Sequence, residues 1–439
     1  MIHLLYDQFE LKSGMRLLRS ILPLFLILII AFGCASKKKT AKSKVHEVKL
    51  YNPTSNEIHP ALKMFHFRDN SSLLYVSYIT SEFLFNQANE KGEYMARAEL
   101  VYELTELGEK ADKDPVVDTL KMNIMLDKTS NKYMATLPMK IKSGKKYFLK
   151  FFTYDLNSNK SGQSYLLIDK TTENSDQNFL IMTPENNFPI FYYVLKAEDQ
   201  FKLQHRKFKS GKLYVSYFRK ERDMPSPTFS LITAPPIHMN PDSIWEFDYT
   251  DTMTFSLPYE GKYFFRFDTT VNEGMTLLNF GKHFPRFMTA EDMIPPLAYL
   301  SNSMDQKEMM AAQNKKLALD NFWYDLAGNM DVARELIRIY YKRAHFSNYY
   351  FTSDKEGWRT DRGMIYIIYG LPDKVLKEVD EEKWQYFDKQ NTVTISFVFR
   401  KRDNPFTDND FELVRDAAYD VHWRRAIDTW RDGKVFIIE

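Results

Sequence analysis

An internal repeat constrains the fold of this chain more than any other feature of its sequence. The run Leu-Tyr-Val-Ser-Tyr occurs at residues 74–78 and again at residues 213–217. A Leu-Pro pair, followed by a glycine and a Tyr-Phe-rich run, occurs at residues 137–151 and again at residues 257–267. Because both landmarks return in the same order, we expect two copies of one structural module.

The pattern inside each copy predicts an all-β module. Side chains alternate with a period near two over residues 147–151, as they do in a half-buried strand. The landmarks lie farther apart in the first copy, and we place the additional residues at 106–117, where Gly108 and a charged run indicate a longer hairpin. Many short strands separated by turns are typical of a β-sandwich. We therefore expect two tandem immunoglobulin-like sandwiches, at residues 45–185 and 186–292.

The N-terminal segment has the organisation of a secretory signal. A basic leader that starts at Met15, the expected initiator, precedes the apolar run 21–30. This run is shorter than the roughly 20 residues that span a bilayer, which argues against the alternative of a membrane-spanning anchor. The end of the segment resembles a lipobox. The resemblance implies that residues 1–33 are a signal peptide and that Cys34 becomes the lipidated, palmitate-bearing residue.

Residues 34–44 form a lysine-rich tether that cannot bury a core. The resemblance to Gram-negative lipoproteins implies a location in the cell, because no aspartate and no acidic cluster follow Cys34. We therefore expect a lipid anchor in the periplasmic leaflet of the outer membrane. The lysines either contact anionic head groups or serve only as a solvated linker.

Composition excludes several classes of function. The 439 residues include 60 basic and 58 acidic side chains, so a formal net charge of +2 gives no field that would attract nucleic acid. A single cysteine excludes an intramolecular disulfide framework and a cysteine-based zinc site. Glycine-rich phosphate loops, zinc-protease motifs and nucleophile elbows are absent from the sequence. We therefore expect no metal and no cofactor.

The pattern changes after Pro295-Pro296, and residues 293–439 predict an α+β domain. Apolar spacings near three and four predict a helical hairpin at 304–326 and 332–346, with a turn at Gly328 and Asp331 as the cap of the second helix. An antiparallel sheet and one more helix should follow. We expect strands at 375–379, 383–387, 392–399, 411–414 and 434–438, and a helix at 418–430.

Residues 357–373 are the most distinctive stretch of this last domain. They begin Gly-Trp-Arg-Thr-Asp-Arg-Gly and continue into residues 365–369, which are all β-branched or aromatic. That composition favours an extended chain, and Gly363 before it and Gly370 after it supply turns. We expect a turn followed by a strand.

This stretch resembles the GWxTD-domain family of bacterial envelope lipoproteins. The resemblance rests on Gly357, Trp358, Thr360 and Asp361 and on the continuation that starts at Arg362-Gly363. It implies a lipoprotein signal, β-rich N-terminal domains and a C-terminal GWxTD domain. The family brings no established catalytic residue, so the resemblance implies location and architecture. Leu371 departs from the family pattern, which often has a second proline there.

The polar residues of the motif admit more than one role. Arg359 and Arg362 flank Asp361, and their charges should favour its ionised form, which suits structural pairing better than general-base catalysis. Thr360 and Asp361 can instead hydrogen-bond backbone amides and lock the turn. Contact with a partner and catalysis are the alternatives. A shared aromatic core is expected, because the last domain contains five of the six tryptophans, at positions 323, 358, 384, 423 and 430.

These features together predict a non-enzymatic, periplasm-facing outer-membrane lipoprotein. It would act as a scaffold or accessory subunit of an envelope complex for secretion, outer-membrane assembly or transport. Its expected partners are the membrane, through lipid at Cys34, and an envelope protein. The alternatives are a glycan- or peptidoglycan-binding module, which requires an open groove lined by aromatic residues, and an enzyme of unknown type, which requires a pocket where Asp361 and Arg362 converge.

Overall fold

The computed structural model describes most of the chain after the expected tether. The described ranges are 46–48, 51–52, 57–88, 92, 94–108, 115–127, 130–232 and 235–438. Cys34, the expected signal peptide and the expected tether lie outside the described residues. No helix within these ranges is both long enough and apolar enough to cross a membrane.

The first module consists of two antiparallel sheets. One contains β2 (Ala61–Arg68), β3 (Ser71–Ile79) and β7 (Lys132–Met139), in that order. The other contains β4 (Gln87–Ala88), β5 (Tyr94–Leu107), β8 (Lys146–Asp155) and β9 (Ser161–Asp169), and β6 (Val116–Leu126) also pairs with β5. Alternate side chains, such as Leu74, Val76 and Tyr78 of β3, are buried in a core between the sheets.

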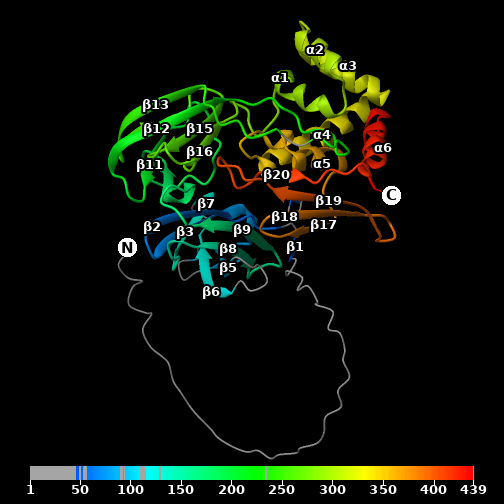
Figure 1. Cartoon of the computed structure of the whole chain (residues 1–439). Coiled ribbons are helices and arrows are strands. Elements are labelled where there is room, and N and C mark those ends of the chain that lie inside the picture. Colours follow the sequence, from blue (N-terminus) through cyan, green and yellow to red (C-terminus); the bar gives the residue numbers. More distant parts are fainter. Residues whose placement is uncertain are drawn as a thin grey trace, which may run out of the picture. The chain divides into compact units, whose positions relative to one another are not determined.

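The second module repeats this arrangement with shorter strands. One sheet contains β10 (Phe179–Met182), β11 (Phe201–His205) and β14 (Thr254–Phe255). The other, visible in Figure 1, has the order β13 (Ser243–Thr250), β12 (Ser210–Arg219), β15 (Gly261–Arg266) and β16 (Met275–Asn279). The strand orders β2-β3-β7 and β6-β5-β8-β9 correspond to β10-β11-β14 and β13-β12-β15-β16, so the two modules have one topology.

Both modules contain a tyrosine corner. Near the start of β8, the hydroxyl of Tyr147 accepts a hydrogen bond from the amide of Lys142 (3.3 Å). Near the start of β15, the hydroxyl of Tyr263 accepts from the amide of Tyr259 (2.8 Å) and donates to its carbonyl (2.9 Å). This contact marks the same corner in immunoglobulin-like sandwiches. The predicted fold class, two tandem all-β sandwiches before an α+β domain, is confirmed.

The first landmark of the expected repeat does not mark equivalent strands. Residues 74–78 lie in β3 and residues 213–217 lie in β12, whereas the topological counterpart of β3 is β11. An alternating apolar pattern is shared by every strand of a sandwich, so a five-residue match does not identify equivalent strands. The second landmark is correct, because it falls on β8 and β15. The division at residue 185 assigned β10 to the first module, but β10 pairs with β11 in the second.

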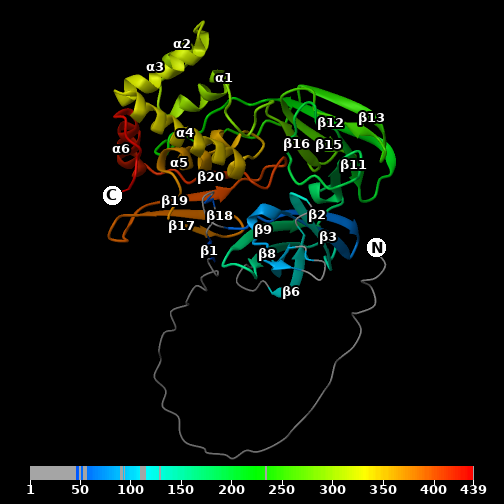
Figure 2. The same cartoon turned by 180° about the vertical axis from the view of Figure 1, so that it is seen from behind.

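The last domain packs helices on an antiparallel sheet. Figures 1 and 2, which view the molecule from opposite sides, show α4 and α5 beside β20. Its helices are α1 (Ala290–Met293), α2 (Ser303–Ala311), α3 (Lys315–Ala327), α4 (Met330–Phe351), α5 (Asp361–Tyr369) and α6 (Tyr419–Arg431). Its sheet has the order β1 (His46–Val48), β17 (Lys374–Lys377), β18 (Glu381–Phe387), β19 (Val393–Lys401) and β20 (Phe411–Leu413). Residues 46–48 were predicted to belong to the first sandwich and instead pair with β17.

Three predicted elements of this domain differ from the structure. The first helix of the expected hairpin is two helices, because the chain leaves the helical conformation at Ala312 and Asn314 caps a new helix. The second is capped by Asn329 and not by Asp331. The expected strand at 434–438 does not form. Within that segment Phe436 packs on Tyr369 in the core, with 5.3 Å between ring centroids.

The predicted strand at residues 365–369 is a helix, α5. The preference of β-branched and aromatic residues for strands is weak, and packing overrides it. Every residue of α5 is buried, so residues 365–369 need no polar face and can all be β-branched or aromatic. The cap at Thr360, whose side chain accepts a hydrogen bond from the amide of Gly363, starts the helix.

Candidate functional site

The motif residues form a turn that abuts the start of α5. The turn is a single 3-10 helix, η5 (Gly357–Arg359). The hydroxyl of Thr360 donates to the carbonyl of Gly357 (2.7 Å) and accepts from the amide of Gly363 (3.1 Å). A Cβ atom at Gly363 would overlap the carbonyl oxygen of Gly357, and one at Gly357 would overlap the carbonyl oxygen of Ser347. Both glycines are therefore required by close backbone packing.

Trp358 is part of the domain core. Its amide donates to the side-chain oxygen of Asn348 (3.1 Å), and its carbonyl accepts from the hydroxyl of Tyr299 (2.6 Å). The guanidinium of Arg359 lies 4.0 Å from the centroid of its ring. All five tryptophans of this domain are buried in one aromatic core, at positions 323, 358, 384, 423 and 430.

Asp361 is buried and fully bonded, but not by the arginines that flank it in sequence. Its carboxylate accepts from the amide of Leu413 (2.8 Å) and from both terminal nitrogens of Arg415 (2.6 and 3.1 Å). Arg359 and Arg362 instead pair with Glu356 and Glu382. Burial raises the pKa of Asp361 above its usual range and outweighs the Arg415 charge. The predicted pairing and the predicted direction of the pKa shift were therefore both wrong.

Arg362 and Glu382 form the most buried ion pair of the domain core. Their side chains are 1% and 0% exposed, and Arg362 Nη1 lies 3.1 Å from Glu382 Oε1. Arg362 Nη2 also donates to the carbonyl (2.8 Å) and side-chain oxygen (2.6 Å) of Asn409. Glu382 accepts further hydrogen bonds from Lys377 and from the hydroxyl of Tyr51 (2.9 Å). The pair lies in a buried network of charged and polar groups. Among the described residues, Arg362 Nε has no hydrogen-bond partner.

The sequence did not reveal Glu382, because it lies in the acidic run 380–382 between the expected strands 375–379 and 383–387. Burial alone raises the pKa of this carboxyl, but Lys377, Arg362 and the hydrogen bonds together lower it to about 2. The only sequence signal was the alternation in β18, which places Glu382 on the same face as the buried Trp384 and Tyr386.

This depressed pKa predicts an acid transition. The unfolded carboxyl titrates at about 4.3, so the stabilisation by ionised Glu382 is complete above that pH and is lost as pH falls from about 4.5 towards 2. We expect the urea midpoint of the last domain to fall over this range. Glu381→Gln, at an exposed neighbour, should keep the fall, whereas Glu382→Gln should remove most of it. An identical pH profile for the two variants would contradict the assignment.

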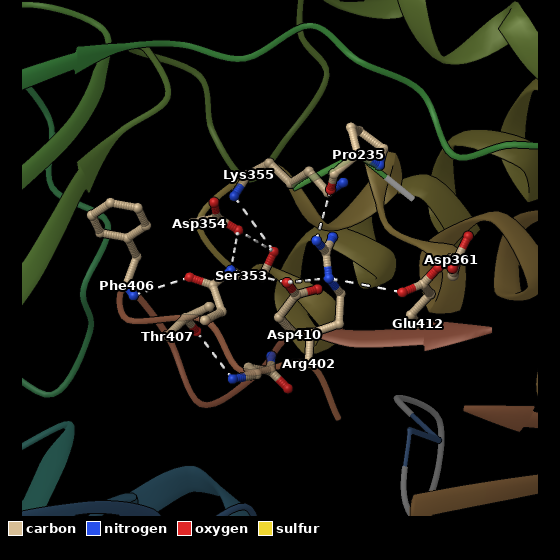
Figure 3. Close-up of polar contacts among 12 residues, drawn as sticks. Pro235, Ser353, Asp354, Lys355, Asp361, Arg402, Phe406, Thr407, Asp410 and Glu412 are labelled. Atoms are coloured by element: carbon tan, nitrogen blue, oxygen red, sulfur yellow. Dashed lines mark hydrogen bonds and ion pairs between the residues drawn. The ribbon is translucent and has the colours of Figure 1, made fainter. Parts of the chain in front are cut away.

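Arginines of the last domain also hold the segment that connects β12 and β13 of the second sandwich. Each donates to a backbone carbonyl of that segment, and Figure 3 shows the one that involves Pro235. The three pairs are Arg359 Nη1 with the oxygen of Arg222 (2.7 Å), Arg402 Nη2 with the oxygen of Pro235 (2.8 Å) and Arg415 Nη2 with the oxygen of Ser226 (3.1 Å). No local pattern predicts these contacts, because each joins residues more than a hundred positions apart.

A buried lysine completes the attachment. Lys262 of β15 is 3% exposed, and its ammonium lies 3.0 Å from Asp354 and 3.7 Å from the centroid of the Phe406 ring. The amide of Asn404 joins Asp354 (3.1 Å) to Asp410 (2.9 Å). Asp354, Phe406 and Asp410 are labelled in Figure 3. The second sandwich and the last domain are therefore joined through buried, paired charges.

A groove with a volume of about 1590 Å³ lies beside this attachment, lined by residues of both sandwiches and the last domain. Tyr165, Tyr192 and Tyr349 line it, and the last two are 52% and 61% exposed. Burial and the neighbouring carboxylate of Asp408 raise the pKa of Asp176, another lining residue, to about 6. Over the ranges that the structure covers, no group of three or more His, Cys, Asp or Glu side chains is placed to hold a metal ion.

The geometry defines a class of protein: β-sandwiches joined by buried ion pairs to an α+β domain with a glycine-framed turn. Residues 261–432 match the GWxTD domain, so the chain contains a GWxTD domain. The matched range starts at β15 of the second sandwich, so it includes Lys262 as well as the motif. A comparison with curated proteins found no match.

Proposed function

We propose that this chain is a non-enzymatic lipoprotein of the outer membrane. It faces the periplasm and acts as a scaffold or accessory subunit of an envelope complex for secretion, outer-membrane assembly or transport. The observation that carries this proposal is that the polar residues of the motif are buried and bonded within the chain. Thr360, Asp361 and Arg362 each form buried hydrogen bonds within the chain. The motif thus stabilises the fold, and we assign the function to exposed surfaces of the chain.

The burial of the motif also weighs against the enzyme alternative. That alternative needs Asp361 and Arg362 to converge in an open pocket. Their side chains are 7% and 1% exposed and have different partners, Arg415 and Glu382. A buried carboxylate with every oxygen bonded has no free position for a substrate proton.

The groove is the surface that we assign to the partner. It combines exposed tyrosines with charged side chains of both signs, among them Lys146, Asp176 and Asp408. Tyrosines in such mixed surroundings are enriched at protein interfaces, where they bury a large area and keep one polar group. The buried attachment of the second sandwich to the last domain fixes two of the groove walls.

Recovery of envelope proteins tests the groove. Tyr192→Ala with Tyr349→Ala should reduce recovery of a cross-linked envelope partner about tenfold or more, because interface tyrosines are often worth about 2 kcal/mol each. Tyr324→Ala is the matched control, since Tyr324 is 45% exposed on α3 and does not line the groove. Equal recovery from both variants, with unchanged melting temperatures, would reject the groove as the partner surface.

Lipidation is tested separately. The expected anchor predicts that metabolically supplied palmitate labels the full chain and that Cys34→Ser removes the label and releases the protein from outer-membrane fractions. The loss of one acyl-bearing site should leave the melting temperature of the folded part unchanged. A wild-type chain that stays unlabelled, or that fractionates with soluble proteins, would contradict the proposed location.

A further inference from the structure

The two sheets of the second sandwich differ in length, which leaves part of its inner face uncovered. In the first sandwich, β7 pairs with β3 along its whole length of eight residues. Its counterpart in the second sandwich, β14, has two residues and pairs with β11 only at Phe201 and Lys202. The opposite sheet still contains β12 with ten residues and β13 with eight. The inner side chains of these long strands therefore extend beyond the short sheet.

An aromatic cleft of about 460 Å³ occupies the uncovered part. Trp245 and Phe247 of β13, Tyr263 of β15 and Tyr259 line it. The rings form one cluster: Trp245 lies 5.9 Å from Tyr263 and 6.5 Å from Tyr259 between centroids, and it stacks on Tyr217 at 5.6 Å with 25° between planes. Tyr259 is 59% exposed. The cleft therefore presents aromatic rings to water.

The cleft is pre-organised. The hydroxyl of Tyr217 donates to the carbonyl of Glu260 (2.8 Å), and the tyrosine corner fixes Tyr263 against the backbone of Tyr259. These bonds hold the rings in place without using the outer faces of Trp245 and Tyr259. A ligand that stacks here would lose little free energy to reordering of the site.

The polar groups around the rings are hydroxyls and an indole N–H. Thr254 and Ser256 line the cleft with Trp245 and Tyr259. Within the described part of the chain, the side-chain polar groups of these four residues have no hydrogen-bond partner. The residues that line the cleft include no charged side chain. The cleft therefore offers aromatic faces and free hydroxyls to a neutral ligand.

We infer that this cleft binds a neutral saccharide. The C–H face of a sugar ring stacks on aromatic rings, and its hydroxyls both donate and accept, as the hydroxyls of Thr254, Ser256 and Tyr259 do. The volume is within the range of about 300–1,000 Å³ that small-ligand sites occupy, and it holds a few sugar units. A proline-rich peptide would also stack on these rings, but its carbonyls only accept hydrogen bonds. The site does not depend on the proposed scaffold role, because the cleft and the groove share no lining residue.

Titration of the full chain with neutral oligosaccharides tests the inference. The probes are chitohexaose and maltohexaose, followed by tryptophan fluorescence and calorimetry, with a galacturonic acid hexamer as the charged comparison and decaproline as the peptide. We expect saturable binding of at least one neutral oligosaccharide and weaker binding of the charged one. Binding of decaproline in place of both sugars, or of none of the probes, would overturn the inference.

Two variants locate the binding. Tyr259→Ala removes an exposed ring and should weaken sugar binding about tenfold, which corresponds to about 1.4 kcal/mol, without a change in melting temperature. Trp245→Ala should weaken it further. Because Tyr259 is exposed, its variant tests the location of the binding site even if the tryptophan variant folds poorly. Tyr192→Ala in the groove should bind sugar as the wild type does, and a loss there instead of at Tyr259 would place the sugar elsewhere.

Discussion

Arg362→Ala is expected to destabilise the last domain by about 3–5 kcal/mol, because it leaves the carboxylate of Glu382 in the core without its guanidinium partner. Lys377 and the hydroxyl of Tyr51 remain beside Glu382, but they cannot replace the two bonds that Arg362 makes to Asn409. Urea unfolding of the purified chain, followed by fluorescence of the tryptophan-rich core, measures the loss.

The matched control is Arg400→Ala, because Arg400 lies on β19, in the same sheet as Glu382. Arg400 pairs with Glu381 at 3.3 Å, but its side chain is 68% exposed, and exposed pairs contribute about 0–1 kcal/mol. Each substitution removes an arginine that pairs with a glutamate of β18: Arg362 pairs with Glu382, and Arg400 pairs with Glu381. Similar losses in the two variants would show that the buried pair is no more important than a surface pair.

Gly363→Ala is expected to destabilise the domain by about 1–3 kcal/mol or more, although helix propensity alone would predict a gain of about 1 kcal/mol. Gly363 lies in the first turn of α5, where its backbone tolerates alanine, but a Cβ atom would overlap the carbonyl of Gly357 and approach Trp358. Main-chain atoms cannot move as a flexible side chain can, so the overlap should displace the turn from the helix.

Gly328→Ala separates overlap from backbone conformation. Gly328 ends α3 with φ of 71°, and a Cβ atom there would meet no atom within 4 Å. Its substitution should cost only the left-handed conformation, about 1 kcal/mol. Thermal unfolding of both variants provides the comparison. A Gly363 variant as stable as the wild type would show that the turn and α5 separate easily.

Local patterns predicted the parts of the fold that local patterns control. Alternation over residues 147–151 identified a strand, and the order of sandwiches, helices and final sheet followed from the changes of period. Residues 365–369 show where this reasoning stops, because burial on every side makes the helix α5 as apolar and β-branched as a strand. Periodicity distinguishes helix from strand only when one face is exposed to water.

Long-range pairing was not predictable in the same way. Sequence reasoning paired Asp361 with its neighbours Arg359 and Arg362, but its partner, Arg415, is 54 positions away. Adjacent side chains at a helix start diverge by about 100° around the axis, so neighbours in sequence rarely meet. The core carboxylate, Glu382, was missed because the expected strand began at residue 383, which left out its alternation with Trp384 and Tyr386.

The pairing of β1 with β17 has a mechanical consequence. Residues 46–48 follow the proposed tether and join the C-terminal sheet before the chain enters the first sandwich, and Tyr51 is bonded to Glu382 in the core of that domain. Tension from a lipid at Cys34 would therefore load the GWxTD domain directly and bypass both sandwiches. Those two modules belong to the part of the polypeptide between β1 and β17, so they would not carry the pull of the membrane.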